Sequence, residues 1–201
     1  MAVRRASPLS PEARRASIIA ATLPLLRAHG RAVTTAQIAL AAGVAEGTLF
    51  RVFPDKEALI AATVESAFDP APVEDELARI DRELPLRDKL VTAVEILQRR
   101  VERVWQLMAV LGIAAPPDPK ARAAAGKLMT EADGRMRAQI AALFEAHRDE
   151  LRIPPEHAAR LLRAMTFAGT HPRITDVPLT AGEIVTVLLD GIRARDDEEL
   201  S

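Results

Sequence analysis

The stretch TTAQIALAAGVAEGTLFRVFPDKEAL, residues 34–59, decides the fold. Thr34 and Gln37 have the spacing of a capping box, which predicts that a helix starts here. This helix is short, because Gly43 favours the left-handed backbone of a tight turn. A second short helix is expected over about 45–53. The stretch therefore predicts two short helices joined by a tight turn.

Longer helices are expected on both sides of this pair. Ser10, followed by proline, is typical of a helix N-terminus, and Gly30 ends that helix. Pro24 lies inside it, which predicts a kink. Asp55 is placed to cap a further helix over 56–68. Two short helices held between longer ones indicate a helix-turn-helix, whose second helix enters the major groove of DNA.

The rest of the chain is also expected to be helical. Ala, Leu, Arg and Glu dominate, Tyr is absent and aromatic residues make up 3% of the sequence, which favours an all-α fold. Two prolines within residues 69–72 mark a boundary, so we predict a DNA-binding domain over 1–68 and a helical effector-binding and dimerisation domain over 69–201. Helices in the second domain are expected at about 73–83, 86–112, 119–150, 155–170 and 180–195.

The charge is distributed unevenly along the chain. The formal net charge is -1, but residues 1–60 hold eight basic and four acidic side chains, a balance of +4. Such a basic N-terminal part suits a domain that contacts phosphates, whereas the remainder is acidic. The arginines Arg4, Arg5, Arg14 and Arg15 either follow the DNA backbone or form a disordered arm.

Composition also excludes several classes of protein. The sequence has no cysteine, which excludes disulfides, thiolate metal sites and a cysteine nucleophile. No apolar run approaches the roughly 18 residues of a membrane span, so we expect a soluble, cytoplasmic protein without membrane contact. The four histidines lack metal-binding spacing and no glycine-rich phosphate loop occurs, so we expect no enzyme, no metal and no cofactor.

The order of residues 34–39, 42–44, 47–50 and 53–59 closely resembles the DNA-binding domain of the tetracycline-repressor (TetR) family. The resemblance covers about residues 14–66. It implies a homodimeric transcriptional regulator that binds double-stranded operator DNA and a small-molecule effector, most simply a repressor. The alternative is a helical protein-interaction module that uses the helix-turn-helix only for packing.

The residues expected to bind DNA lie at the start of the first short helix, along the second short helix, and at the start of the helix over 56–68. The threonines, Gln37 and Lys56 can bind phosphate, although Thr34 can equally serve only as a cap. Gly47 either lets the helix approach the groove closely or serves packing, and Arg51 reaches phosphate or guanine or is simply a surface arginine. Phe50 stands where the family often has tyrosine, and Ala45 where many relatives have a capping serine. The full set is Thr34, Thr35, Gln37, Glu46, Gly47, Thr48, Phe50, Arg51 and Lys56.

The effector and dimer sites are less sharply defined by the sequence. An apolar effector is expected, because the bulky or adaptable side chains available for a pocket are mostly apolar. Each of these residues can instead belong to the ordinary core, and His171 can be a surface residue. The pocket set is Trp105, Met108, Leu111, Met129, Met136, Phe144, Phe167 and His171. The family resemblance implies a dimer interface on the last two helices, for which the candidates are Leu161, Leu162, Met165, Ile184, Val187, Leu188 and Gly191.

Overall fold

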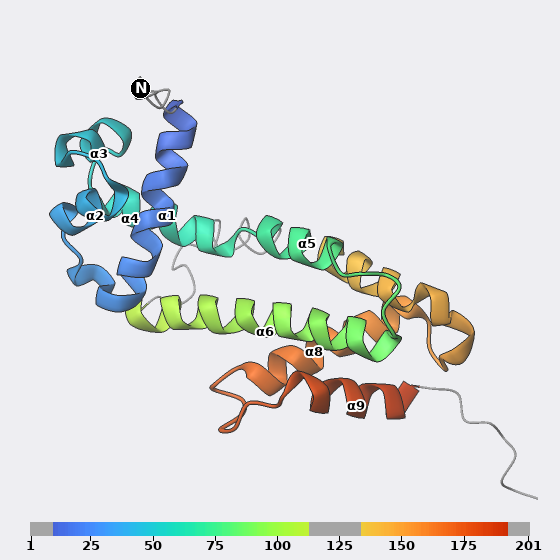
Figure 1. Cartoon of the computed structure of the whole chain (residues 1–201). Helices are drawn as coiled ribbons and strands as arrows, with labels where there is room; N and C mark the ends of the chain where they lie inside the picture. Colours follow the sequence, from blue (N-terminus) through green and yellow to red (C-terminus); the bar gives the residue numbers. More distant parts are fainter. Residues whose placement is uncertain (1–9, 113–133, 193–201) are drawn as a thin grey trace, which may run out of the picture. The chain divides into compact units, whose positions relative to one another are not determined.

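The computed structural model describes residues 10–112 and 134–192, and these residues form α-helices and short 3-10 turns without a β-strand (Figure 1). The predicted all-α class is confirmed. The N-terminal elements are α1 (Pro11–His29), η1 (Gly30–Ala32), α2 (Thr35–Ala42), α3 (Glu46–Val52) and α4 (Lys56–Phe68). The later elements are α5 (Ala71–Ala78), α6 (Leu86–Leu111), a helix over 134–144, η2 (Glu145–Glu150), α8 (Pro155–Thr170) and α9 (Ala181–Ile192).

The chain divides into two compact units. The first ends at Asp69 and also takes in the end of α6 from Gln106 onward, whereas the second begins at Pro70. Each unit has its own apolar core. The core of the first unit includes Ile18, Leu26, Ile38, Leu49, Phe53, Leu59, Leu107 and Leu111. The core of the second includes Leu90, Val94, Ile140, Phe144, Leu162, Ile184, Leu188 and Leu189.

Local signals in the sequence set the boundaries of the helices in the first unit. The Ser10 hydroxyl accepts a hydrogen bond from the Ala13 N–H at 3.1 Å, and α1 continues as one helix past Pro24. Gly43 has a φ of 66°, the left-handed conformation expected after α2. Asp55 caps α4 by accepting from the Ala58 N–H at 2.7 Å. α1 packs against α2 and α4, and α2 packs against α3, so the three-helix core holds α3 in place.

In the second unit, two of the predicted helices have different bounds, and the end of a third lies outside the described residues. α5 begins and ends earlier than the predicted 73–83, because Pro72 fits in the first turn of a helix, where no N–H donor is needed. The predicted helix over 119–150 changes to 3-10 geometry after Phe144, and residues 119–133 lie outside the described part of the chain. α9 is described as far as Ile192, so the predicted end at 195 also lies outside.

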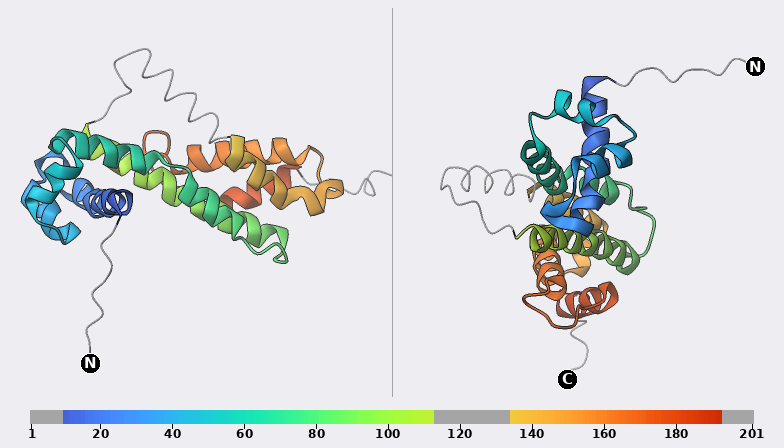
Figure 2. Two further views of the ribbon diagram at one scale, coloured as in Figure 1. Left: turned by 90° about the horizontal axis from the view of Figure 1, so that it is seen from above. Right: turned by 90° about the vertical axis from the view of Figure 1, so that its left-hand side faces the viewer.

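Helices α8 and α9 run side by side in opposite directions (Figures 1 and 2). The predicted capping box at the start of α9 is present, with the Thr180 N–H donating to the Glu183 carboxylate at 2.8 Å. Hydrogen bonds from the Thr180 backbone and hydroxyl lower the pKa of Glu183. At the C-terminal end of α9, the backbone N–H of Arg152 donates to the Ile192 carbonyl at 2.8 Å. The Arg152 guanidinium donates to the Gly191 carbonyl. Side chains and loop backbone thus supply hydrogen bonds near both ends of α9.

No helix in the described parts of the chain is both long enough and apolar enough to cross a membrane.

Candidate nucleic-acid interface

The outer face of α3 is exposed, whereas its inner face is part of the core. Leu49 and the following Phe53 are buried, at 2% and 3% exposure. Glu46, Gly47, Phe50 and Arg51 are exposed, and their helical spacing places them on the opposite side of the helix. Thr48 is half-buried between the two faces. α3 therefore offers a narrow stripe of mixed chemistry to a DNA groove.

At the start of α2 the capping box is complete. The Thr34 hydroxyl accepts from the Gln37 N–H at 3.2 Å, and the Gln37 side-chain oxygen accepts from the Thr34 N–H at 2.8 Å. The Thr34 hydroxyl proton is directed to the same Gln37 oxygen, at 3.1 Å. The capping function of Thr34 is therefore observed, and its exposed position keeps it available at the end of the helix for a phosphate.

Thr35 connects α2 to α3. Its hydroxyl donates to the Oε1 atom of Glu46, eleven residues further along the chain. Ala45 caps α3 without a side-chain hydrogen bond, so the helix start lacks the usual side-chain acceptor. Glu46 is thus fixed from α2 rather than by its own helix.

Gly47 has no packing reason to be a glycine. A Cβ atom built at this position meets no atom within 4 Å, and the backbone is ordinary α-helix. The packing alternative for this residue therefore has no support within the chain. A bare backbone on this exposed face would allow close approach of another molecule, which stays a prediction for Gly47.

A Gly47→Ala variant tests this prediction. Alanine is favoured over glycine inside a helix by about 1 kcal/mol, so we expect a slightly higher melting temperature. We also expect at least about tenfold weaker operator binding, because the added methyl group separates α3 from the groove, an effect worth ~1.4 kcal/mol or more. Thermal unfolding and DNA titration measure the two effects. An unchanged affinity would show that α3 does not approach DNA at Gly47.

The two basic side chains of the site differ in their surroundings. Arg51 is exposed, and no described residue forms a hydrogen bond or ion pair with it. Lys56 is half-buried at the start of α4, and its Nζ donates to the Arg31 carbonyl at 2.8 Å. Arg31 in turn pairs with Glu57 at 2.5 Å. The Lys56 ammonium group is therefore held in place and keeps further N–H donors for a ligand. The Arg51 side chain is not held by another residue of the described chain.

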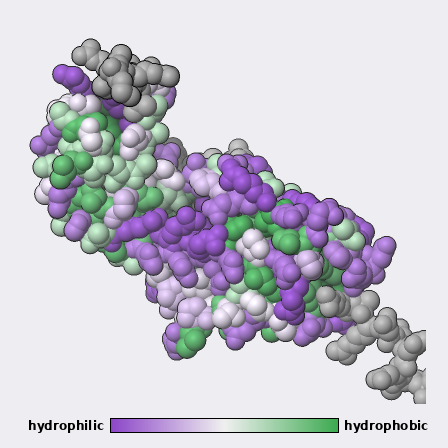
Figure 3. All heavy atoms as spheres, in the orientation of Figure 1, coloured by the Kyte–Doolittle hydropathy of each residue, from purple (hydrophilic) through white to green (hydrophobic). Residues whose placement is uncertain are grey.

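Leu40 was not among the sequence candidates for contact, and Arg15 was expected only in a basic arm, which is wrong as to its structure because Arg14 and Arg15 lie in α1. Arg15 of α1 lies with its guanidinium 4.5 Å from the centre of the Phe53 ring, a cation–π contact that no local sequence pattern indicates. Leu40 of α2 is 84% exposed, and its spacing of three residues from exposed Gln37 was the available signal. Figure 3 shows apolar surface over α2 and α3, where Leu40 and Phe50 are exposed.

The structure does not bring all of the expected effector residues together. Leu111 is buried in the core of the first unit, and Met108, also in that unit, is half-buried. Met136 and Phe144 belong to the core of the second unit. The Met129 position lies outside the described residues.

The three remaining effector candidates form a partly exposed aromatic cluster in the second unit. The His171 ring lies 4.4 Å from the Trp105 ring and 4.9 Å from the Phe167 ring, measured between ring centres. Phe167 is 48% exposed. His171 also ends α8, donating from its N–H to the Phe167 carbonyl at 2.9 Å. Among the described effector candidates, only these three side chains lie close together as a shared pocket would require.

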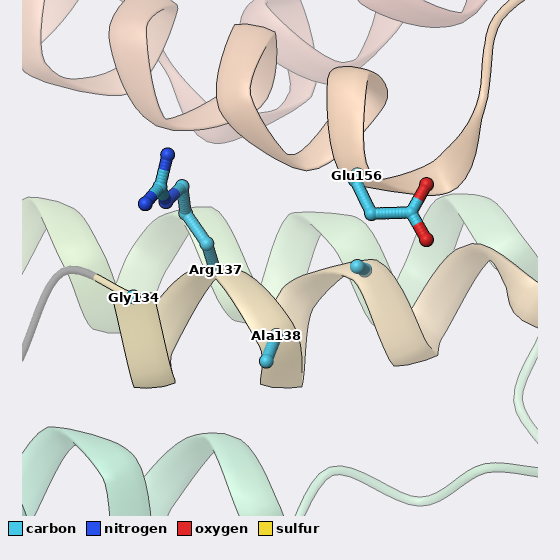
Figure 4. A pocket seen from close by; sticks show the side chains of 5 residues that line it. Gly134, Arg137, Ala138 and Glu156 are labelled. Atoms are coloured by element: carbon cyan, nitrogen blue, oxygen red, sulfur yellow. The ribbon is translucent and has the colours of Figure 1, made fainter.

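A small hollow of about 220 Å³ opens in the second unit between the helix over 134–144 and the start of α8 (Figure 4). Arg137 and Glu156 line it with three small residues, Gly134, Ala138 and Ala141. Among the described residues, none of the expected effector candidates lines this hollow.

The dimer candidates divide between the core and the surface. Leu162, Ile184 and Leu188 are at most 3% exposed and belong to the core of the single chain, which corrects their assignment to an interface. The reason is that α8 and α9 pack on each other through these side chains. Leu161, Val187 and Gly191 are exposed and Met165 is half-buried, so they remain candidates.

Residues 18–63, which span α2, α3 and most of α1 and α4, match the family model described as bacterial regulatory proteins, tetR family. The chain carries a DNA-binding domain of the TetR family at its N-terminus. It is a transcriptional regulator with an N-terminal helix-turn-helix. No curated protein matches the chain.

Three solved structures share the fold over nearly the whole chain. A transcriptional regulator from Rhodococcus sp. Rha1 is 18% identical, covers 94% of this chain and 100% of its own, and superposes with a TM-score of 0.59. NalD, the secondary repressor of the MexAB-OprM multidrug efflux pump in Pseudomonas aeruginosa, is 22% identical over 90% of this chain and 98% of its own (TM-score 0.54). A SmeT–triclosan complex is 20% identical over 94% and 95% (TM-score 0.55).

Proposed function

We propose that this TetR-family regulator is a repressor whose dimer binds a near-palindromic operator and is released from it by a small-molecule effector. The exposed stripe of α3, held against a three-helix core and carrying Arg51, is the observation that carries the proposal. Such a helix is presented for insertion into the major groove, while α2 and α4 place Thr34 and Lys56 for contact with phosphates. Repression follows most simply from occlusion of the operator.

Several side chains of the site have defined tasks in this proposal. Lys56, fixed by the Arg31 carbonyl, binds a phosphate as a point charge. Arg51 binds phosphate or the O6 and N7 atoms of guanine. Phe50, 51% exposed, supplies an apolar contact that a thymine methyl group can accept. Thr48 adds a hydroxyl for phosphate, and Gly47 allows the approach.

Dimerisation is proposed through the exposed face shared by α8 and α9. Leu161 of α8 and Val187 of α9 are 41% and 63% exposed. Large apolar side chains at this exposure, on two adjacent helices, suit a helical interface with a second copy. A dimer also presents two α3 helices, so it reads two half-sites separated by about one turn of the duplex.

The effector is proposed to bind in the second unit and to act by preferring one conformation of the dimer over another. A ligand with equal affinity for the operator-bound and free forms would not change binding. A structure of the relative SmeT with triclosan shows that a protein of this fold takes a small molecule. The effector of this chain is proposed to be apolar, since the side chains available in the unit are largely apolar.

The proposal is tested first by removing the two basic residues of the site together. An Arg51→Ala, Lys56→Ala variant is expected to bind operator DNA at least about tenfold more weakly than wild type and with a shallower salt dependence, because each dimer loses four phosphate-neutralising charges. Titration of selected operator DNA at two salt concentrations measures both effects. Thermal unfolding accompanies it, because Lys56 also binds the Arg31 carbonyl.

A matched control removes the same charge from the second unit. Arg79 and Arg82 are exposed there, and an Arg79→Ala, Arg82→Ala variant is expected to bind operator like wild type. Equal loss in both variants would attribute the effect to net charge alone. A wild-type protein that selects no DNA sequence would contradict the repressor proposal and favour a helical interaction module.

A further inference from the structure

We propose that Glu46 reads a cytosine in each operator half-site and that Thr35 is the residue that positions its carboxylate. The inference rests on the proposed function, because it assigns base specificity to the same helix-turn-helix. The inference explains why α3 has an acidic side chain, Glu46, on the face that is proposed to meet DNA.

The position of Glu46 places it at the base edges rather than at the DNA backbone. It is the first residue of α3, and it is exposed beside Gly47, which has no side chain to separate the helix from the groove. In helix-turn-helix complexes, the N-terminal residues of the second helix contact base edges. A carboxylate beside phosphates would be repelled, so a favourable place for Glu46 lies deeper in the groove.

The chemistry of the carboxylate selects the base. An ionised glutamate only accepts hydrogen bonds, so it needs a donor on the base edge. In the major groove the donors are the N4 amino group of cytosine and the N6 amino group of adenine. Adenine places its N7 acceptor beside that donor, where a second carboxylate oxygen would be repelled, whereas cytosine has no acceptor on its own edge there. Cytosine is therefore the preferred partner.

Thr35 limits the freedom of this carboxylate. Its hydroxyl donates to Oε1 of Glu46, and Oε2 has no hydrogen bond among the described residues. Thr35 is half-buried at the start of α2, which packs against α3, so the bond is anchored on the core. A hydroxyl has one proton, and the Thr35 proton is used for Glu46 rather than for a phosphate. The glutamate is thus held in one orientation before DNA binds, which lowers the entropy lost on contact.

The experiment is a random-sequence selection with the full-length dimer and three variants. Wild type is expected to enrich C·G at one position of each half-site. Glu46→Gln is expected to move that preference to A·T, because glutamine pairs with N6 and N7 of adenine, with at least about tenfold discrimination. Thr35→Val is expected to keep the preferred base but reduce the discrimination severalfold, and Thr35→Ser, which keeps the hydroxyl, to restore it.

The control and the contradicting results are distinct from those of the proposed function. Glu65→Gln removes another exposed carboxylate of the first unit, from α4, and is expected to leave the selected sequence unchanged. If wild type selects an operator and Glu46→Gln selects the same bases at every position, this inference is wrong while the repressor proposal stands. If Thr35→Val discriminates as strongly as wild type, Thr35 has no positioning role. If wild type selects no sequence, the repressor proposal falls and this inference falls with it.

Discussion

Replacing Leu161 with aspartate is expected to convert the dimer into monomers and to lower operator affinity about 100-fold, equivalent to ~2.7 kcal/mol. Leu161 is 41% exposed on α8, which packs against α9, where Val187 is 63% exposed. A carboxylate introduced there would be buried without a partner when two copies associate, at a cost of several kcal/mol. A two-fold interface contains the substitution twice, which doubles the penalty.

Sedimentation velocity and DNA titration measure the two parts of this result. The matched control is Leu84→Asp, because Leu84 has a similar exposure of 38% but lies in the connection between α5 and α6. This variant is expected to remain dimeric and to bind operator normally. A dimeric Leu161→Asp protein with wild-type affinity would show that the second copy binds elsewhere, and unfolding of either variant is monitored by its helical circular dichroism.

Local signals allowed most of the first unit to be predicted from the sequence. The Thr34–Gln37 box, Gly43 and the Asp55 cap act on their own neighbours within three or four residues, so the sequence contains the whole cause. The TetR resemblance was confirmed by the match over residues 18–63. The start of α9 followed the same rule through Thr180.

Features that depend on tertiary packing could not be predicted from local sequence patterns. Leu162 and Leu161 are neighbours of the same chemical type, yet one is in the core and the other is 41% exposed, because only the packing of α9 decides which side of α8 is covered. The hydrogen bond from Thr35 to Glu46 and the contact of Arg15 with Phe53 join separate helices, and no spacing rule describes them. The hollow beside Arg137 likewise depends on how two helices approach.

Gly30 is expected to be the least replaceable glycine of the first unit. Its φ of 56° and ψ of -142° lie in a region that side chains rarely adopt, which costs about 1–3 kcal/mol for another residue. A Cβ atom there would also lie 3.0 Å from Cγ1 of Val110 and 3.1 Å from the Val110 carbonyl oxygen. One of these neighbours is backbone and cannot turn away, so the end of α6 would have to shift.

We therefore expect Gly30→Ala to destabilise the protein by about 3 kcal/mol and to lower its melting temperature by about 10 °C. Gly43→Ala is the comparison, since Gly43 also has positive φ but meets no atom within 4 Å, and its expected cost is only about 1–2 kcal/mol. Adding Val110→Ala to Gly30→Ala should recover part of the loss, because it removes Cγ1 but leaves the carbonyl. Equal melting temperatures for the two glycine variants would mean that backbone conformation alone, and not contact with α6, determines the need for glycine at position 30.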